Sequence, residues 1–289
     1  MSTEPTIDGL GLTSRWVAAL RERESLRPDR LFDDPYAAAL AGDAGRALAA
    51  AVEADLPAMA GTRGLAVRTR YLDDMLAAAV AEGVRQIVIL AAGMDARAYR
   101  LPWPPGTVIY EVERGDVMAL KDQVMADLAA QPKAECRPVR IDLREDFAAA
   151  LRAQGFRDGE PAAFLVEGLL IYLPDRAAVL RILREVAALG APGSWIGLDV
   201  VGEQFLSLPM VDPVQRRLAG MEAGWFFGTD DPAALLREAG FERVSVSASS
   251  RLPYAPARPA ERQEGSAKLA GDAYYMVTAR RGAGLLSRA

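Results

Sequence analysis

Two residues near the middle of the chain have types and a spacing that suit the binding of a nucleoside. Gly93 follows a short apolar run, residues 87–90, and Glu113 ends the next apolar run twenty positions further on. A glycine lets a ligand approach the backbone, and an acid at this spacing can accept both hydroxyls of a ribose. The carboxyl ends of neighbouring parallel strands meet at one edge of a sheet. The spacing therefore predicts one nucleoside pocket formed by two strand ends.

The glycine pattern in the stretch Gln86–Arg100 is reduced compared with a dinucleotide-binding fingerprint. Ala91 stands at the position of the first glycine of that fingerprint, and the third glycine is absent. Asp95 lies where it could open a helix. The alternative interpretation of this stretch is a tight turn from a strand into a helix that binds no ligand.

Arg68 is a candidate for binding an anionic part of a ligand. A helix is predicted over residues 62–82, and Arg68 falls on its apolar side, three positions after Leu65 and four before Leu72. A buried guanidinium requires a partner, and the carboxylate of a ligand is a natural one.

The composition excludes several kinds of catalytic site. The 289 residues contain no histidine, so a Ser-His-Asp triad, a His-ligated zinc and an imidazole base are ruled out. Catalysis must then use carboxylates, Tyr, Lys, Arg or positioning alone, and we predict no metal site. The one cysteine, Cys136, excludes an internal disulfide and fits a reducing compartment.

The charge and the hydropathy of the chain limit the kinds of partner that it can have. The 34 basic and 39 acidic residues give a net charge of −5, which argues against a general nucleic-acid surface. The sequence has no charged start followed by an apolar segment, and no apolar run approaches the roughly 20 residues needed to span a bilayer. We therefore predict a cytoplasmic protein with neither a nucleic-acid nor a membrane partner.

Strands and helices alternate along most of the chain, which predicts a doubly wound, mainly parallel α/β sheet. Five strands are expected at residues 87–90, 107–113, 137–143, 162–174 and 193–201. The last two strands, Val244–Ala248 and Ala273–Ala279, have no obvious helix between them, so they are predicted to pair antiparallel.

Two regions depart from this alternation. The residues before the first strand predict a layer of helices, the first of them capped by Thr13 or Ser14 after a mobile arm at residues 1–11. Residues 202–229 carry several large apolar side chains among polar ones and are too long for a plain connection. One interpretation is a lid that supplies an apolar wall for a substrate, and the other is a helical insertion packed on the sheet.

Five blocks in the same order resemble the leucine carboxyl methyltransferase family. They are Arg63–Arg68, Ile89–Leu101, Tyr110–Glu113, Val139–Leu143 and Val166–Pro174. The resemblance is greater to the bacterial branch of S-adenosylmethionine-dependent O-methyltransferases, and it extends from about Trp16 to the last strand.

The resemblance implies a class I methyltransferase (Rossmann-like) fold. Such a fold has a seven-stranded, mainly parallel sheet with a reversed last strand and an N-terminal helical cap. Residues 1–83 would form the cap, and residues 84–289 would form the S-adenosylmethionine-binding core, with the insertion at about 202–229.

The resemblance also implies which residues contact the amino-acid tail of the cofactor S-adenosylmethionine. Arg68 would hold the methionine carboxylate, and Glu167 would face the amino group. Gly93 would let the cofactor lie against the first strand, next to Ala91, which replaces a glycine frequent in the family.

The nucleoside end of the cofactor would meet the next two strand ends. Glu113 would bind the ribose in place of the usual aspartate, and Asp142 and Leu143 would frame the adenine. Arg15 corresponds loosely to a basic cofactor contact in the cap.

The expected activity is O-methylation of a carboxylate or hydroxyl on a small, apolar or aromatic acceptor, in secondary metabolism. A carboxylate acceptor needs no base, whereas a phenol or alcohol must lose a proton. Tyr172 and Tyr99 are candidate acceptor-side residues, and no catalytic base is assigned. Two alternatives remain open at this point: a nicotinamide-dependent oxidoreductase, and a protein that binds S-adenosylmethionine without catalysis.

Overall fold

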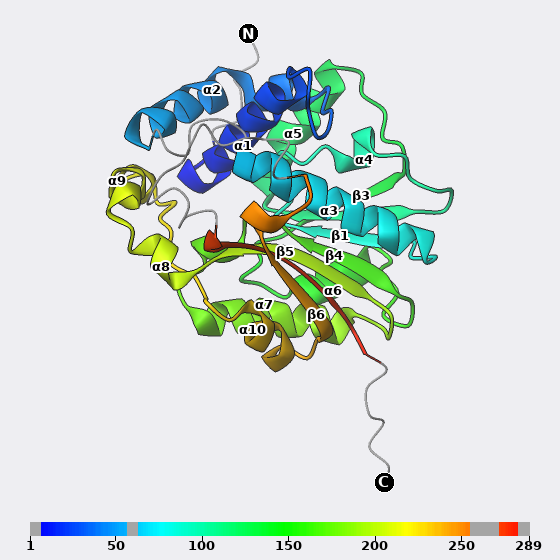
Figure 1. Cartoon of the computed structure of the whole chain (residues 1–289). Coiled ribbons are helices and arrows are strands. Elements are labelled where there is room, and N and C mark those ends of the chain that lie inside the picture. Colours follow the sequence, from blue (N-terminus) through cyan, green and yellow to red (C-terminus); the bar gives the residue numbers. More distant parts are fainter. Residues whose placement is uncertain (1–6, 57–62, 255–271, 283–289) are drawn as a thin grey trace.

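The computed structural model describes residues 7–56, 63–254 and 272–282. A central sheet is covered by helices on both faces, and two further helices, α1 and α2, lie beyond the end of the sheet (Figure 1). In the described part of the chain, no helix is long and apolar enough to cross a membrane.

The sheet has seven strands in the order β3-β2-β1-β4-β5-β7-β6. The strands are β1 Gln86–Leu90, β2 Val108–Glu113, β3 Glu135–Arg140, β4 Ala162–Val166, β5 Trp195–Val201, β6 Glu242–Ala248 and β7 Tyr274–Arg280. β7 pairs antiparallel with both β5 and β6, and the pairs among β1 to β5 are parallel. The mainly parallel sheet and the reversed last strand are confirmed.

The strand order reverses at β1, whose neighbours are β2 on one side and β4 on the other. The helices that follow β1 and β4 therefore leave the sheet in opposite directions, and a crevice opens at the carboxyl ends of these strands. This switch point is where open α/β sheets bind their ligands.

Both faces of the central strands β1 and β4 are buried. All five residues of β1 are buried, and Val88 packs among residues of α6 (Phe147–Ala153), α7 (Arg176–Leu189) and α10 (Pro232–Glu238). Ile87 packs on the other side against residues of α3 (Arg63–Ala81). A strand buried on both faces reads as a continuous apolar run, which is why the sequence predicted β1 and β4 clearly.

α1 (Gly9–Ser25) and α2 (Ala37–Asp55) form a second apolar cluster together with residues from the segment 202–229. That segment contains α8 (Glu203–Leu206), the short helix η3 (Pro209–Val211) and α9 (Asp212–Ala219). Its side chains in this cluster include Phe205, Val214, Leu218 and Trp225, which join Trp16, Leu40 and Val52 of the cap helices. The segment is therefore partly helical and packs on α1 and α2, and its role as a lid stays a prediction.

α1 begins earlier than the sequence suggested, so the predicted caps Thr13 and Ser14 are wrong. Asp8 caps the helix, and its Oδ1 accepts a hydrogen bond from the Gly11 amide at 2.7 Å. The hydroxyls of Thr13 and Ser14 lie inside the helix and donate to backbone carbonyls of the preceding turn. Aspartate is among the preferred capping residues, and here it starts the helix at Asp8 although Gly9 and Gly11 follow.

β4 is shorter than predicted, because it ends at Val166 rather than near residue 174. Gly168 takes a left-handed backbone conformation with φ of 64°, and Leu170–Tyr172 coil into the short helix η2. This break leaves Glu167 just beyond the strand, at the carboxyl edge of the sheet. The remaining helices are α4 (Arg97–Arg100), α5 (Gly115–Asp127) and η4 (Ser249–Arg251).

Candidate active site

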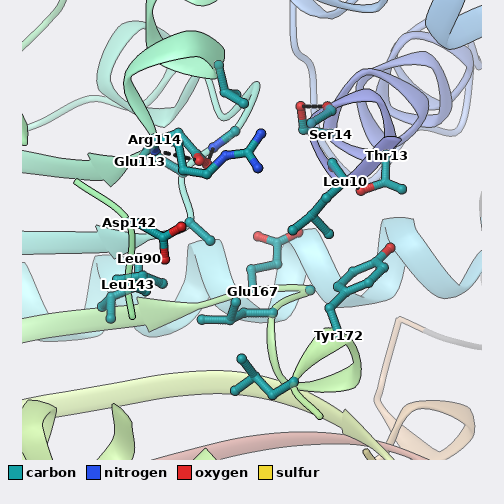
Figure 2. Close-up of a pocket in the computed structure, with 18 of the residues that line it drawn as sticks. Leu10, Thr13, Ser14, Leu90, Glu113, Arg114, Asp142, Leu143, Glu167 and Tyr172 are labelled. Carbon is teal, nitrogen blue, oxygen red and sulfur yellow. Dashed lines mark hydrogen bonds between the residues drawn. The ribbon is translucent and has the colours of Figure 1, made fainter. Parts of the chain in front are cut away.

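A cavity of about 590 Å³ lies at the carboxyl ends of β1 to β4 and beneath α1 (Figure 2). Seven of the residues predicted to contact a cofactor line it: Arg68, Ala91, Gly93, Glu113, Asp142, Leu143 and Glu167. Arg15 does not line it, and its Nε donates instead to the Ala41 carbonyl at 2.9 Å. Tyr172 also lines the cavity. Tyr99 instead packs edge-on against Tyr36, with ring centroids 5.7 Å apart, so the structure brings only the first of the two candidate tyrosines to the site.

The turn after β1 is shaped by two residues with positive φ, Ala91 at 49° and Gly93 at 48°. A non-glycine residue in this conformation costs about 1 kcal/mol, which Ala91 bears at the edge of the cavity. A side chain at Gly93 would come within 2.7 Å of the Ser14 Cβ atom. The glycine is therefore required both by its φ and by the close approach of α1.

Glu113 stands at the tip of β2 with its carboxylate fixed by two backbone amides. Its Oε2 accepts from the Gly93 N–H at 2.8 Å, and its Oε1 accepts from the Arg114 N–H at 2.7 Å. Each oxygen keeps a lone pair for a further donor such as a ribose hydroxyl. Burial raises the pKa of Glu113 despite these bonds.

Two residues after β3, one polar and one apolar, line the cavity side by side. Asp142 accepts hydrogen bonds from the backbone and guanidinium of Arg144, and this lowers the pKa of Asp142. Leu143 faces the same cavity together with three apolar side chains, Leu169, Leu173 and Ile182. An apolar slot beside a carboxylate suits a planar base with an amino group.

Glu167 is the centre of a buried ionic network. Its Oε1 accepts from Arg21 at 3.0 Å and from Arg68 at 2.9 Å, and its Oε2 accepts from Arg97 at 2.6 Å. Burial alone would raise the pKa of Glu167, but the charges of Arg97, Arg68 and Arg21 outweigh it and hold that pKa well below its usual range. Glu167 is therefore an anion at any physiological pH.

The arginines around Glu167 are held by further acids. Arg97 is fully buried, and it also pairs with Asp95 and, at 2.7 Å, with Asp73. Arg68 lies 3.4 Å from Asp199 and 3.3 Å from the hydroxyl of Tyr274, which in turn donates to Asp199 at 2.8 Å. Arg68 thus meets protein carboxylates as well as the cavity.

One face of α1 covers the site. Leu10, Ser14, Val17 and Arg21 recur at helical spacing and all line the cavity. The start of α1 is tied to the end of β2, because Arg114 NH2 pairs with Asp8 Oδ1 at 2.8 Å. Sequence reasoning missed this face, and the spacing of these four residues is the signal that could have revealed it.

The part of the chain that forms this cavity matches a known protein family. The model named Leucine carboxyl methyltransferase matches residues 14–187, which include every strand end that lines the cavity. The chain belongs to the leucine carboxyl methyltransferase family. The resemblance noted from five sequence blocks is confirmed.

Relatives within the family support its activity. A protein of Mycolicibacterium smegmatis, named "Putative S-adenosyl-L-methionine-dependent methyltransferase/", is 48% identical over 207 residues, which cover 68% of this chain and 69% of that protein. A protein of Mycobacteroides abscessus with the corresponding name is 38% identical over 292 residues, covering 95% and 96%. This family member is a methyltransferase with S-adenosylmethionine as its cofactor.

Solved structures support the fold. The crystal structure of a DUF574 family protein from Streptomyces avermitilis superposes with a TM-score of 0.65 at 17% identity, covering 93% of this chain and 97% of that one. A crystal structure described as a "putative methyltransferase" from Thermobifida fusca gives a TM-score of 0.62 at 20% identity, with 96% of each chain covered. The class I methyltransferase fold is confirmed.

The cavity fits this cofactor, which joins a nucleoside to an amino-acid tail. An acid at a strand tip and an apolar slot occupy one part of the cavity, and guanidiniums occupy another. Arg21 keeps a buried Nε atom without a hydrogen-bond partner. Such an orphaned donor is what an anionic group in the cavity would satisfy.

We expect Arg97→Gln to destabilise the fold, because it leaves Asp73, Asp95 and Glu167 buried with less compensating charge. Removing one partner of a buried ion pair costs about 3 kcal/mol or more. Urea denaturation measures the loss. The matched control is Arg70→Gln, whose exposed pair with Asp74 at 2.9 Å contributes at most about 0.5 kcal/mol. Equal effects of the two substitutions would contradict a structural role for the network.

We expect Glu113→Ala to weaken binding of S-adenosylhomocysteine by about 2 kcal/mol, the scale of hydrogen bonds to a charged group. Isothermal titration calorimetry measures it, with the exposed Glu135→Ala as control. Because burial raises the pKa of Glu113, the wild-type affinity should fall on acidification at a higher pH than an ordinary glutamate would give. Unchanged affinity in the variant would remove Glu113 from the site.

Proposed function

We propose that this methyltransferase acts on an oxygen of a small acceptor, and that a carboxylate is the best supported acceptor group. The proposal is carried by the states of Glu167 and Tyr172, two ionisable groups at the acceptor end of the cavity, because neither is suited to act as a base. Glu222, from the segment 202–229, is a further carboxylate that lines the cavity. The cofactor placement below defines the acceptor end.

The nucleoside of the cofactor lies, in this proposal, among the ends of β1, β2 and β3. Glu113 accepts the ribose hydroxyls, and Asp142 and Leu143 frame the adenine. Figure 2 shows Asp142 and Leu143 on one side of Glu167 and Tyr172 on the other. The acceptor then enters on the side of Tyr172.

The amino-acid tail of the cofactor lies between the turn after β1 and the network of Glu167. Arg68 holds its carboxylate, and the backbone of Ala91 and Gly93 runs beside it. Glu167 binds its amino group, because three guanidiniums leave one of about four acceptor positions on this carboxylate open.

Tyr172 is one of the polar side chains at the acceptor end, where Thr13 lies beside it. Burial raises the pKa of its phenol, although the neighbouring side chains of Trp225 and Thr13 oppose that rise. The phenol is therefore neutral near pH 7 and serves as a hydrogen-bond donor or acceptor rather than as a base. Burial, with Glu111 nearby, raises the pKa of Tyr99 to about 12, and this residue lies outside the lining of the cavity.

The segment 202–229 reaches the cavity through Glu222, and its last residues pack beside Tyr172. The amides of Phe226 and Phe227 donate to the Ile171 carbonyl at 2.7 and 3.3 Å, which holds this part of the segment beside Tyr172. Trp225 is buried here. These contacts support the interpretation of the segment as a wall of the acceptor space.

The chemistry requires positioning above all. When bound, the cofactor supplies a methyl group that its sulfonium already activates. Glu167 has a pKa too low to remove a proton from an alcohol, and Tyr172 keeps its own proton near pH 7 because burial raises its pKa. An acceptor that is already an anion needs no base, because the site has only to align its oxygen with the methyl group.

A matched panel of acceptors tests the proposal. We expect turnover with aromatic or aliphatic carboxylic acids but not with the corresponding alcohols, at a rate nearly independent of pH from about 6 to 9 because the acid stays ionised. Release of S-adenosylhomocysteine measures turnover. Activity confined to alcohols or phenols and rising with pH would overturn the carboxylate assignment. Tight cofactor binding without transfer to any acceptor would favour the non-catalytic alternative.

For an acceptor found in this panel, we expect Tyr172→Phe to lower kcat/KM by about tenfold or more, through loss of one hydrogen bond to a charged group. The affinity for S-adenosylhomocysteine should stay unchanged, because Tyr172 lies beyond the amino-acid tail. Tyr99→Phe is the control and should alter neither quantity. An equal effect of both substitutions would remove Tyr172 from the acceptor end.

A further inference from the structure

Trp225, near the end of the segment 202–229, carries a buried hydrogen-bond donor that is not used. The residue is 7% exposed, and its indole Nε1 has no hydrogen-bond partner among the described residues. An indole N–H can donate but cannot accept. A buried donor that stays unpaired lowers stability, so this atom calls for an explanation.

The surroundings of Trp225 leave its ring little freedom to turn. The ring packs against that of Phe205, with centroids 5.9 Å apart and planes inclined at 42°. The next two amides, of Phe226 and Phe227, donate to the carbonyl of Ile171 at 2.7 and 3.3 Å. Ile171 directly precedes Tyr172, so these bonds fix the indole and the phenol next to each other. A group that completes the indole N–H must therefore come to it.

The hydroxyl of Tyr172 is a polar group beside this indole. Burial raises the pKa of Tyr172, and the neighbouring side chains of Trp225 and Thr13 oppose that rise. Tyr172 lines the cavity, whereas Trp225 is not among the described residues that do. An acceptor in the cavity thus meets the phenol and not the indole. Trp225 can act on an acceptor only through Tyr172.

The hydrogen bonds open to the Tyr172 hydroxyl have fixed directions. Thr13 Oγ1 donates its one proton to the Leu10 carbonyl at 2.7 Å, so toward Tyr172 it can only accept. Figure 2 shows the Tyr172 hydroxyl directed toward Thr13 of α1. Tyr172 has one proton to donate, and an anionic oxygen in the cavity is a stronger acceptor for it than the neutral Thr13 hydroxyl.

We propose that Trp225 is a positioning residue for Tyr172: the Tyr172 O–H turns toward an acceptor carboxylate, and its oxygen then accepts from the Trp225 N–H. The inference rests on the proposed function and adds a determinant of acceptor choice to it. We call this chain of two hydrogen bonds the relay. Donation from the indole polarises the phenol and makes it a better donor. Tyr172 then meets the acceptor as a donor, which suits an ionised oxygen better than a hydroxyl.

The indole N–H signals of the four tryptophans give a direct test. Proton–nitrogen NMR of the full chain with S-adenosylhomocysteine shows one such signal per tryptophan, and Trp225→Phe identifies that of Trp225. The probe is the carboxylic acid with the highest turnover in the acceptor panel. We expect this acid to move the Trp225 proton signal downfield in wild type, because a hydrogen bond deshields the proton. In Tyr172→Phe the signal should stay in place.

Kinetics with the same acid give a second measurement. We expect Trp225→Phe to lower kcat/KM by about fivefold, the scale of one neutral hydrogen bond. In the Tyr172→Phe background the same substitution should change kcat/KM by less than about twofold, because the relay is already broken there. The affinity for S-adenosylhomocysteine should stay unchanged in all three variants.

Trp195→Phe is the matched control. The buried Nε1 of Trp195 also lacks a hydrogen-bond partner among the described residues. Trp195 begins β5, at the end of the sheet away from the cavity, and Arg280 lies 3.9 Å over its ring. This substitution should leave kcat/KM unchanged, and the acid should not move the Trp195 signal.

Each other outcome has a definite meaning. If the acid leaves the Trp225 signal in place, or moves it equally in Tyr172→Phe, the relay is wrong while the proposed function stands. Additive losses from the two substitutions contradict the relay in the same way. If Trp225→Phe does not fold, phenylalanine variants of the other tryptophans identify its signal, and wild type and Tyr172→Phe carry the test. If no carboxylic acid is methylated, the proposed function fails, and the relay fails with it.

Discussion

The burial of one carboxylate, that of Glu167, organises this molecule. Arg21 from α1, Arg68 from α3 and Arg97 from α4 all reach it from outside the sheet. The desolvation of so many charges offsets most of their mutual attraction, so the network contributes little net stability compared with an apolar core. Its effect is geometric. A displacement of α1, α3 or α4 relative to the sheet would separate a buried ion from its partner, so the network favours the observed position of these helices.

Much of the site could be predicted because an acidic residue stands at the end of several of the apolar runs that form strands. Glu113, Asp142 and Glu167 each follow a strand-like run, and parallel pairing must bring such ends together. Arg21 could not be identified in this way, since a basic residue in an amphipathic helix is usually solvated. Its role depends on where α1 lies, and packing between distant segments decides that. The early start of α1 was missed for a related reason, because Gly9 and Gly11 are poor helix formers, and the helix begins there with the Asp8 cap and close packing against Met221 and Val117.

The family match covers the residues at one end of the cavity more completely than those at the other. The family match covers residues 14–187, and therefore all the strand ends proposed to hold the cofactor. Trp225, which lies beside Tyr172, comes from beyond this range, in a segment that departs from the regular alternation of strands and helices. The proposed cofactor contacts thus all fall within the part of the chain that the family match covers. The proposed acceptor end also includes residues from beyond it.

The tie between Asp8 and Arg114 determines how firmly one side of the cavity is held. Arg114 Nη2 pairs with Asp8 Oδ1 at 2.8 Å at the start of α1, and Ser14 of the same helix lies against the turn at Gly93. Asp8 and Arg114 are partly exposed, and exposed ion pairs contribute about 1 kcal/mol or less. The first turn of α1, which lines the cavity through Leu10 and Gly11, is therefore attached to the end of β2 by a weak interaction.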